Sequence, residues 1–153
     1  MKYGVYGLGR IGLIHARLVM DLGHDVCAIG NDSEAANKNG SKTLSLDVDT
    51  YQSPENMVNV HPELDAVIIA SHTRKHARHT WPFVDAGIPV FLEKPLTDEL
   101  PDAFDFVRHT GTRENIIQIG LQRRFDEALC YAKEFLDQGA IGEIREIRSV
   151  LRD

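Results

Sequence analysis

The chain of 153 residues has the length of one domain, and its 17 Lys and Arg against 23 Asp and Glu give a formal net charge of −6 at pH 7. Hydrophobic residues make up 42% and charged residues 26%, which provides a sizeable core and excludes a disordered or collagen-like chain. The acidic balance excludes a general affinity for nucleic acid or anionic membranes, because both require a broad positive field. The negative net charge does not exclude a phosphorylated small molecule as a ligand, because backbone N–H groups at a helix N-terminus bind phosphate without Lys or Arg.

The sequence predicts a cytoplasmic protein. No apolar run approaches the roughly 18 to 20 residues that cross a bilayer, and the longest, residues 66–70, is typical of a buried strand. The first residues reach glycine at once and lack the apolar core of a signal peptide.

Short β-prone runs alternate with amphipathic stretches along the first 121 residues. Strands are predicted over residues 2–6, 25–29, 66–70, 89–92 and 116–121. Helices are predicted over residues 11–22, from Asp32-Ser33-Glu34 through Lys38, from Ser53-Pro54-Glu55, and over residues 74–86 and 98–109. This alternation predicts an α/β fold of the Rossmann type, a doubly wound parallel sheet covered by helices.

The last 30 residues leave this pattern. An apolar stripe predicts a helix that ends at Gly139, and residues 143–151 are predicted to form a strand. We therefore expect a dinucleotide-binding domain over residues 1–123, and over residues 124–153 a linking helix with the first strand of a second domain. Such a strand without a neighbour leaves an open edge for pairing. The stripe consists of Phe125, Leu129, Ala132 and Leu136.

A glycine-rich loop follows the first strand. Gly7, Gly9 and Gly12 fit the pattern G-x-G-x-x-G between a strand and a helix, which is the context that a dinucleotide fingerprint requires. The first glycine permits the tight turn, the second lets the backbone approach a pyrophosphate, and the third lets helix and strand pack closely. The loop predicts nucleotide binding.

The dinucleotide fingerprint also includes an acid about 20 residues further on, which accepts hydrogen bonds from ribose hydroxyls. The candidate is Asp32, although Asp32 or Ser33 is equally suited to cap the next helix. Gly30 stands where the acid is usual, and no arginine follows to bind a 2′-phosphate, although Lys38 and Arg10 are candidates. The sequence leaves the choice between NAD and NADP open.

Three histidines, His72, His76 and His79, follow one another at i, i+4 and i+7, which brings them toward one helix face. No set of carboxylates or thiols accompanies them and their neighbours are basic, so we predict no metal site. The segment from Ser71 to His76 lies beyond a strand's carboxyl end, where this architecture binds ligands, which favours a cofactor contact for His76. His79 is typical of a solvated helix face.

The tripeptide Glu93-Lys94-Pro95 also follows a strand's carboxyl end. A lysine at this position can exchange a proton with a substrate oxygen. The proline restricts the backbone of Lys94 and can adopt a cis peptide bond.

Together, the glycine loop, His76, Glu93-Lys94-Pro95 and the stretch 120–126 resemble the Gfo/Idh/MocA family of nicotinamide-dependent sugar and polyol oxidoreductases. Residues 118–126, 139–143 and 148–153 are most similar to the inositol 2-dehydrogenase branch of that family. The resemblance covers the whole chain.

The resemblance implies an NAD- or NADP-dependent dehydrogenase of CH–OH groups, acting on a polyol, sugar or cyclitol such as myo-inositol, with a homo-oligomeric full-length form. It implies that Lys94 is the catalytic lysine and that Arg123 lies near the substrate entrance. The dinucleotide fingerprint adds Gly12 and Asp32 to the predicted cofactor site. The cofactor contacts that the resemblance implies are Gly7, Gly9, Arg10, Ile11, Ser71, His72, His76, Glu93 and Gln122.

Family members continue into a C-terminal α/β domain that holds the substrate and supplies an Asp and a His. This sequence ends at Asp153, so we expect the C-terminal substrate domain to be absent and the chain alone to be inactive. The alternative is a stand-alone, non-catalytic NAD(P)-binding or regulatory module. The early end favours such a module, whereas the intact Lys94 and Arg123 disfavour it.

Overall fold

The computed structural model describes residues 1–111 and 116–150. The chain forms two compact units, Met1–Gly120 and Leu121–Asp153. Among the described residues, no helix has the length and apolarity needed to cross a bilayer.

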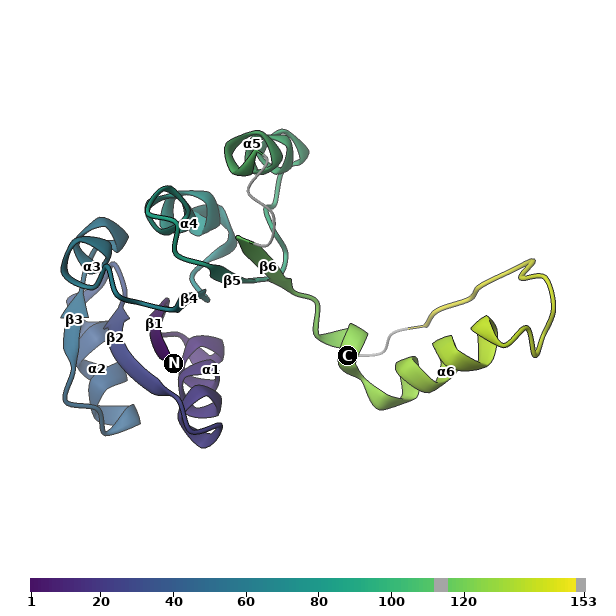
Figure 1. Cartoon of the computed structure of the whole chain (residues 1–153), viewed down its shortest axis with the longest axis horizontal. Helices are drawn as coiled ribbons and strands as arrows, with labels where there is room; N and C mark the ends of the chain where they lie inside the picture. The colour runs from purple at the N-terminus through teal and green to yellow at the C-terminus, as the bar shows by residue number, and fades with distance from the viewer. Residues whose placement is uncertain (112–115, 151–153) are drawn as a thin grey trace. The chain divides into compact units, whose positions relative to one another are not determined.

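The first unit is built on a sheet whose described strands are all parallel (Figure 1). Their order, β3-β2-β1-β4-β5-β6, is that of a Rossmann fold. The chain reverses its direction of travel across the sheet between β1 and β4, and ligands bind beyond the carboxyl ends of the strands at such a point. The strands are β1 (Lys2–Tyr6), β2 (Asp25–Gly30), β3 (Asp49–Tyr51), β4 (Ala66–Ile69), β5 (Val90–Glu93) and β6 (Ile117–Gly120).

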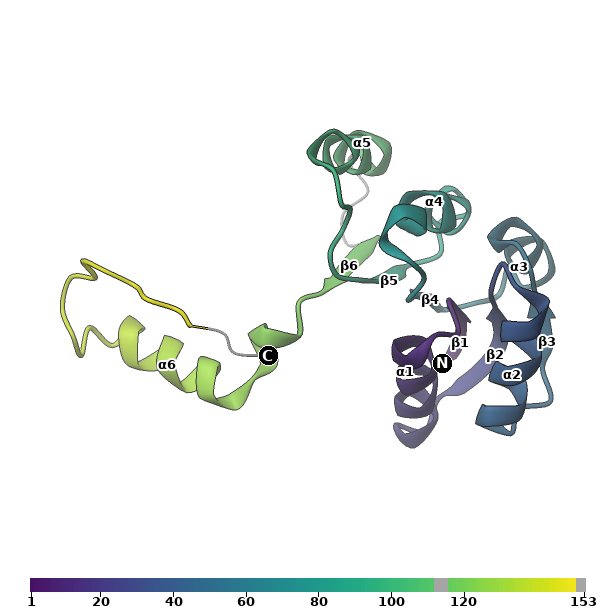
Figure 2. The same ribbon diagram turned by 180° about the vertical axis from the view of Figure 1, so that it is seen from behind.

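Helices cover both faces of this sheet, as Figures 1 and 2 show from opposite sides. On one face lie α1 (Arg10–Asp21) and α2 (Glu34–Leu44). The opposite face carries α3 (Pro54–Val60), α4 (His76–Asp85), which follows the short 3-10 helix η1 (Thr73–Lys75), and α5 (Leu100–Thr110). The predicted doubly wound α/β fold is confirmed.

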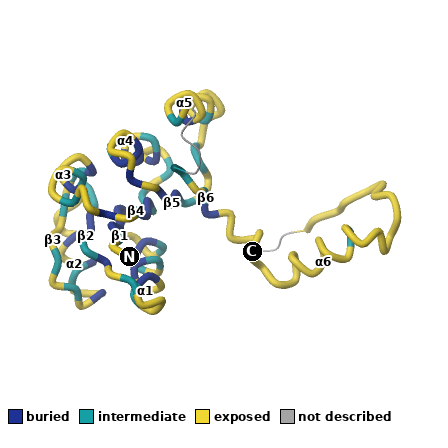
Figure 3. The backbone as a smooth tube through the Cα atoms, viewed as in Figure 1, coloured by how far each residue is buried: buried dark blue, intermediate teal, exposed yellow. Residues whose placement is uncertain are grey.

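The core lies in two layers, one on each face of the sheet, and Figure 3 shows buried backbone along the central strands. Successive side chains of a strand point to opposite faces. Val5 therefore packs with Ala16 of α1, while Tyr6 packs with Phe83 and Val84 of α4. This alternation places the aromatic ring of Tyr6 on the α4 side of the sheet, directly before the glycine loop.

Strand β3 was not predicted from the sequence. It has three residues, of which only Tyr51 is apolar, and it pairs with β2 at the edge of the sheet. A strand so short carries too little alternation to be recognised.

The second unit contains the 3-10 helix η2 (Gln122–Phe125) and α6 (Glu127–Asp137). The predicted helix is confirmed: the Asp126 side chain accepts a hydrogen bond from the Leu129 N–H at its start, and Gly139 follows its end with φ +71°. Figure 3 shows this unit exposed almost throughout, in agreement with the burial of its residues.

The predicted strand over residues 143–151 is wrong for residues 143–150, which form no strand, while Leu151 lies outside the described residues. A strand is stable only when a neighbour pairs with its backbone. Within the described part of this unit no second strand supplies that pairing, and Ile147 is 79% exposed. The apolar residues of this segment therefore do not make an open sheet edge here.

Candidate functional site

The glycine loop joins β1 to α1, and two of its glycines are required by packing within the protein. Gly7 has φ +103°, and a Cβ there would lie 2.3 Å from the backbone nitrogen of Ser71. A Cβ at Gly12 would lie 1.9 Å from the carbonyl oxygen of Gly7. Gly12 brings α1 close to the strand, as the sequence predicted, and Gly7 also brings the loop after β1 against the loop after β4.

Gly9 differs, because nothing inside the described protein requires a glycine there. Its backbone is extended, with φ −77° and ψ −175°, and a Cβ would meet no heavy atom within 4 Å. Gly9 is the N-cap of α1, and no side chain caps this helix end. The open space at Gly9 therefore borders the N–H groups of Arg10 and Ile11 in the first turn, where an anion is stabilised by the helix dipole.

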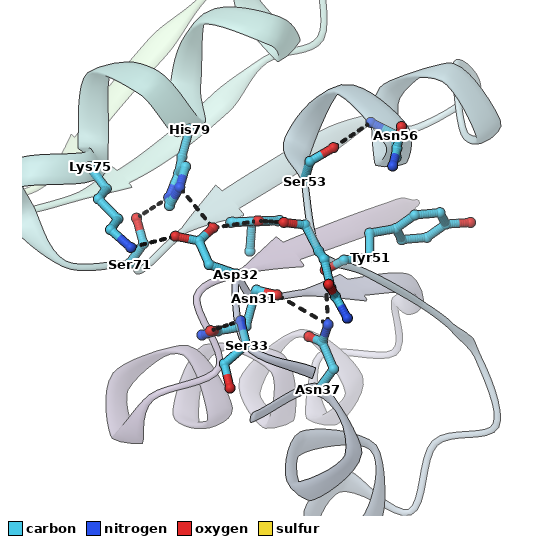
Figure 4. Close-up of polar contacts among 12 residues, drawn as sticks. Asn31, Asp32, Ser33, Asn37, Tyr51, Ser53, Asn56, Ser71, Lys75 and His79 are labelled. Atoms are coloured by element: carbon cyan, nitrogen blue, oxygen red, sulfur yellow. Dashed lines mark hydrogen bonds and ion pairs between the residues drawn. The ribbon is translucent and has the colours of Figure 1, made fainter. Parts of the chain in front are cut away.

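A group of polar side chains surrounds the Asp32 carboxylate beyond the carboxyl ends of β1, β2 and β4 (Figure 4). Oδ1 of Asp32 accepts a hydrogen bond from the hydroxyl of Tyr6 at 2.8 Å, and Oδ2 accepts one from Nζ of Lys75 at 2.6 Å. Burial alone raises the pKa of Asp32, but the hydrogen bonds from Lys75 and Tyr6 outweigh it and hold the pKa below its usual value. Asp32 is therefore a charged carboxylate at neutral pH.

Asp32 does not cap the next helix; Ser33 does, because its hydroxyl accepts the N–H of Ala36 at 3.5 Å. The Asp32 side chain is 30% exposed, so a ligand can reach it. It borders a pocket of about 260 Å³. The pocket is lined by Tyr6, Asn31, Asp32, Ser33, His72, Lys75 and His79.

His79 is buried, so its predicted place on a solvated helix face is wrong. The residue is 1% exposed, its Nδ1 lies 2.8 Å from the hydroxyl of Ser71, and its ring packs edge-on against Tyr6. Its Nε2 lies 3.1 Å from Oδ1 of Asp32 without hydrogen-bond geometry. Periodicity missed this position because the groups that its ring meets, the Ser71 hydroxyl and the Asp32 carboxylate, belong to other loops of the sheet's carboxyl edge.

Burial lowers the pKa of the His79 imidazole below its ordinary 6.5, and the charges of Arg78 and Lys75 act in the same direction. The carboxylates of Asp32 and Glu55 oppose this shift without cancelling it. The folded chain therefore keeps His79 neutral at a pH where the unfolded chain protonates it.

This difference predicts that the fold loses stability as the pH falls below about 6.5, because the unfolded state then binds more protons than the native state. The loss ends at the lower pKa of folded His79. Urea unfolding at pH 7.5 and pH 5.5 measures it, and His79→Gln should flatten the difference while His24→Gln, at a half-buried histidine outside the pocket beside Asp32, should not. An equal pH dependence in both variants would contradict the assignment.

His76 connects the loops that follow β4 and β5. It is 1% exposed, with Nδ1 2.9 Å from the carbonyl oxygen of Pro95 and Nε2 3.1 Å from that of Ser71. Ser71 is half-buried, whereas His72 is exposed and lines the pocket beside Asp32. The His76 ring thus lies between carbonyl oxygens of both loops and can donate to one of them as a neutral imidazole, while a direct contact with a cofactor stays a prediction.

Glu93 ends β5 and is fixed on both carboxylate oxygens. Oε1 lies 2.8 Å from Nε2 of His15 on α1, and Oε2 accepts the backbone N–H of Lys94 at 3.1 Å. The Lys94–Pro95 peptide bond is cis, and the side chain of Lys94 is exposed. His15 was not predicted from the sequence, because nothing in its helix indicates a partner 78 residues away.

Gln122 and Arg123 belong to η2 in the second unit. Their predicted places beside the nicotinamide and at the substrate entrance stay predictions.

The residues at the switch point of the sheet fit a dinucleotide. The open space at Gly9 and the uncapped start of α1 suit a pyrophosphate, and the partly exposed Asp32 carboxylate suits the hydroxyls of a ribose. A buried polar atom without a hydrogen-bond partner, Nε2 of His79, lies beside that carboxylate. Fold and site together define a dinucleotide-binding domain.

The chain belongs to the Gfo/Idh/MocA family: residues 1–121 match the family described as "Oxidoreductase family, NAD-binding Rossmann fold". This agrees with the resemblance seen in the sequence, and it establishes the NAD-binding character of the domain.

The relatives include inositol dehydrogenases. The chain is 32% identical to the myo-inositol 2-dehydrogenase of Thermotoga maritima over 154 aligned residues, covering 100% of this chain and 46% of that protein. It is 32% identical to the scyllo-inositol 2-dehydrogenase (NAD(+)) of Bacillus subtilis, covering 100% and 45%. The chain thus spans less than half the length of these relatives.

Solved structures agree with this grouping. The scyllo-inositol dehydrogenase of Lactobacillus casei with bound NAD(H) and scyllo-inositol superposes with a TM-score of 0.84 at 31% identity, over 94% of this chain and 43% of that one. The myo-inositol dehydrogenase of the same organism, in complex with NAD(H) and myo-inositol, gives 0.85 at 29% identity, over 93% and 42%.

Proposed function

We propose that this chain is the dinucleotide-binding part of an NAD-dependent dehydrogenase that oxidises a secondary alcohol of a cyclitol such as an inositol. The observation that carries the proposal is the open space at Gly9, where neither the backbone conformation nor the internal packing explains a glycine. A ligand that approaches the backbone closely does explain it. The cyclitol is supported by the relatives that are inositol 2-dehydrogenases.

Different residues of the chain would bind the parts of the cofactor and the substrate. The first turn of α1 would hold the pyrophosphate, Asp32 would hold a ribose, and Glu93, fixed by His15, would border the nicotinamide side. When bound, the nicotinamide supplies hydride transfer. Lys94 would exchange a proton with the reacting hydroxyl at its Nζ, and His76 would hold the loop that carries Lys94 through the carbonyl of Pro95.

Titration of the purified 153-residue chain with NADH tests the binding half of the proposal. We expect saturable binding, and at 100 times Kd the ligand should raise the free energy of unfolding by about 2.7 kcal/mol. Isothermal calorimetry and urea unfolding with and without NADH measure these two quantities. No binding and no stabilisation would contradict the proposal.

Assays with NAD and myo- or scyllo-inositol test the catalytic half. We propose that the chain alone binds the cofactor without turnover, as expected from its length relative to the inositol dehydrogenases. A form that continues into a substrate domain and still leaves both inositols unchanged while binding NADH would favour the alternative, a non-catalytic NAD(P)-binding module.

A further inference from the structure

Tyr6 places a buried hydroxyl at the end of β1. It ends β1 immediately before the glycine loop, it is 0% exposed, and it carries a hydroxyl that a purely apolar core does not need. This hydroxyl lies 2.8 Å from Oδ1 of Asp32 and 2.9 Å from the backbone oxygen of Gln52. Its single hydrogen can point to only one of these two acceptors at a time, and the charged Asp32 oxygen, which borders the pocket, is the stronger acceptor.

Gly30 explains how the ring reaches that carboxylate. Tyr6 and Gly30 are paired residues on the neighbouring strands β1 and β2. A Cβ at Gly30 would lie 2.5 Å from Cδ2 and 2.6 Å from Cε2 of Tyr6. The aromatic ring thus occupies the space of a side chain at the end of β2, where the acid of the dinucleotide fingerprint is usual, and the acid is displaced to Asp32.

The position of Asp32 then decides what its surroundings can bind. With Tyr6 on Oδ1 and Lys75 on Oδ2, the carboxylate retains lone pairs for the two hydroxyls of a ribose. A 2′-phosphate would instead meet a negative charge. If Asp32 turned away, Nζ of Lys75 would be left as a cation suited to that phosphate.

We propose that Tyr6 is a positioning residue for nucleotide selection, whose hydroxyl fixes the Asp32 carboxylate in the pocket beside Lys75 and thereby favours NAD over NADP. This inference rests on the proposed function of the site. The burial of the Tyr6 side chain supports it, because the hydrogen-bond partners of this hydroxyl are two protein oxygens, that of Asp32 and the backbone oxygen of Gln52, and of these Asp32 is the charged one.

Tyr6→Phe tests the proposal, because it removes the hydroxyl and keeps the ring that fills the space at Gly30. The measured quantity is the ratio of Kd for NADPH to Kd for NADH, obtained by fluorescence titration of the 153-residue chain. Loss of a hydrogen bond to a charged group should lower this ratio roughly tenfold. In an Asp32→Asn background, Tyr6→Phe should change the ratio no further.

Tyr51→Phe is the matched control, since the hydroxyl of Tyr51 lies 2.9 Å from Nε2 of His61 and contacts no residue of the pocket. It should leave the ratio unchanged. An unchanged ratio in Tyr6→Phe, or an equal weakening of both nucleotides, overturns the proposal.

Asp32→Glu provides a second route that does not alter the core. It keeps the negative charge but moves the carboxylate by one methylene relative to the Tyr6 hydroxyl, and it should also lower the ratio. A ratio at the wild-type value in Asp32→Glu overturns the proposal even where Tyr6→Phe fails to fold. Binding of neither nucleotide by the wild-type chain is a different result, because it overturns the proposed function itself.

Discussion

Replacing Gly9 by valine is expected to weaken NADH binding strongly while leaving the fold intact. A Cβ at this position meets no heavy atom within 4 Å, and the backbone conformation is one that any residue adopts. The cost to stability is therefore only that of a poorer N-cap, about 1 kcal/mol or less. The added methyl groups would occupy the space in front of the N–H groups that we expect to bind the pyrophosphate.

The expected size of the binding effect follows from those N–H groups. Two hydrogen bonds to a charged group contribute about 1.5–3 kcal/mol each, so their loss weakens NADH by roughly 100-fold or more. Calorimetric titration measures the loss, and urea unfolding of the same sample measures the stability. Wild-type affinity in Gly9→Val would place the cofactor elsewhere.

Gly12→Val is the contrasting variant in the same loop. A Cβ there would lie 1.9 Å from the carbonyl oxygen of Gly7, so helix and strand cannot keep their contact. We expect a destabilisation on the order of 3 kcal/mol or more, visible in urea unfolding without any ligand. The pair of variants separates a glycine needed by the ligand from a glycine needed by the fold.

The sequence predicted those parts of the fold that local pattern determines. The strand, glycine turn and helix at residues 2–22 follow from a β-prone run, three glycines and apolar residues at helical spacing, and the structure places them within two residues of the expected bounds. Local pattern alone did not predict the structure of residues 143–150. Apolar residues among charges are compatible with a strand, but only a pairing partner makes one.

The sequence predicts the loops of the candidate site, because they follow the carboxyl ends of recognisable strands. It does not predict which side chains from distant segments meet there. The loops at Gly7, Ser71 and Lys94 follow β1, β4 and β5 and were expected near the ligand. The sequence does not show that Gly30 makes room for the Tyr6 ring, because this contact depends on the register of β1 against β2.

The sequence also did not predict which polar side chains are buried. His79 has the spacing of a surface residue, but in the fold its Nδ1 meets the Ser71 hydroxyl and the Asp32 carboxylate lies 3.1 Å from its Nε2. The same holds for His15, whose ring on α1 reaches the end of β5. Both histidines were assigned no partner from the sequence, since each partner lies in a different structural element.

In a form of the protein that oxidises an inositol, Lys94→Ala is expected to lower kcat by about 10² to 10⁴-fold, the range that general acid–base groups contribute. The Kd for NADH should stay unchanged, because the backbone N–H of Lys94, and not its side chain, is bound to Glu93. Steady-state kinetics with NAD and myo-inositol measure the first quantity, and NADH titration the second. Lys133→Ala, which removes a surface lysine paired with Asp137 on α6, is the control and should leave both unchanged.

Lys94→Arg separates the two ways in which a lysine can act. Arginine keeps the positive charge but does not release its proton at any pH at which the protein is folded, so it cannot exchange one with the substrate hydroxyl. If Lys94 moves a proton, Lys94→Arg should be as slow as Lys94→Ala. Recovery of kcat in Lys94→Arg would mean that the side chain supplies only charge, and a wild-type kcat in Lys94→Ala would remove Lys94 from the reaction altogether. Because Nδ1 of His76 lies 2.9 Å from the carbonyl oxygen of Pro95, next to this lysine, His76→Ala should lower kcat in the same assay.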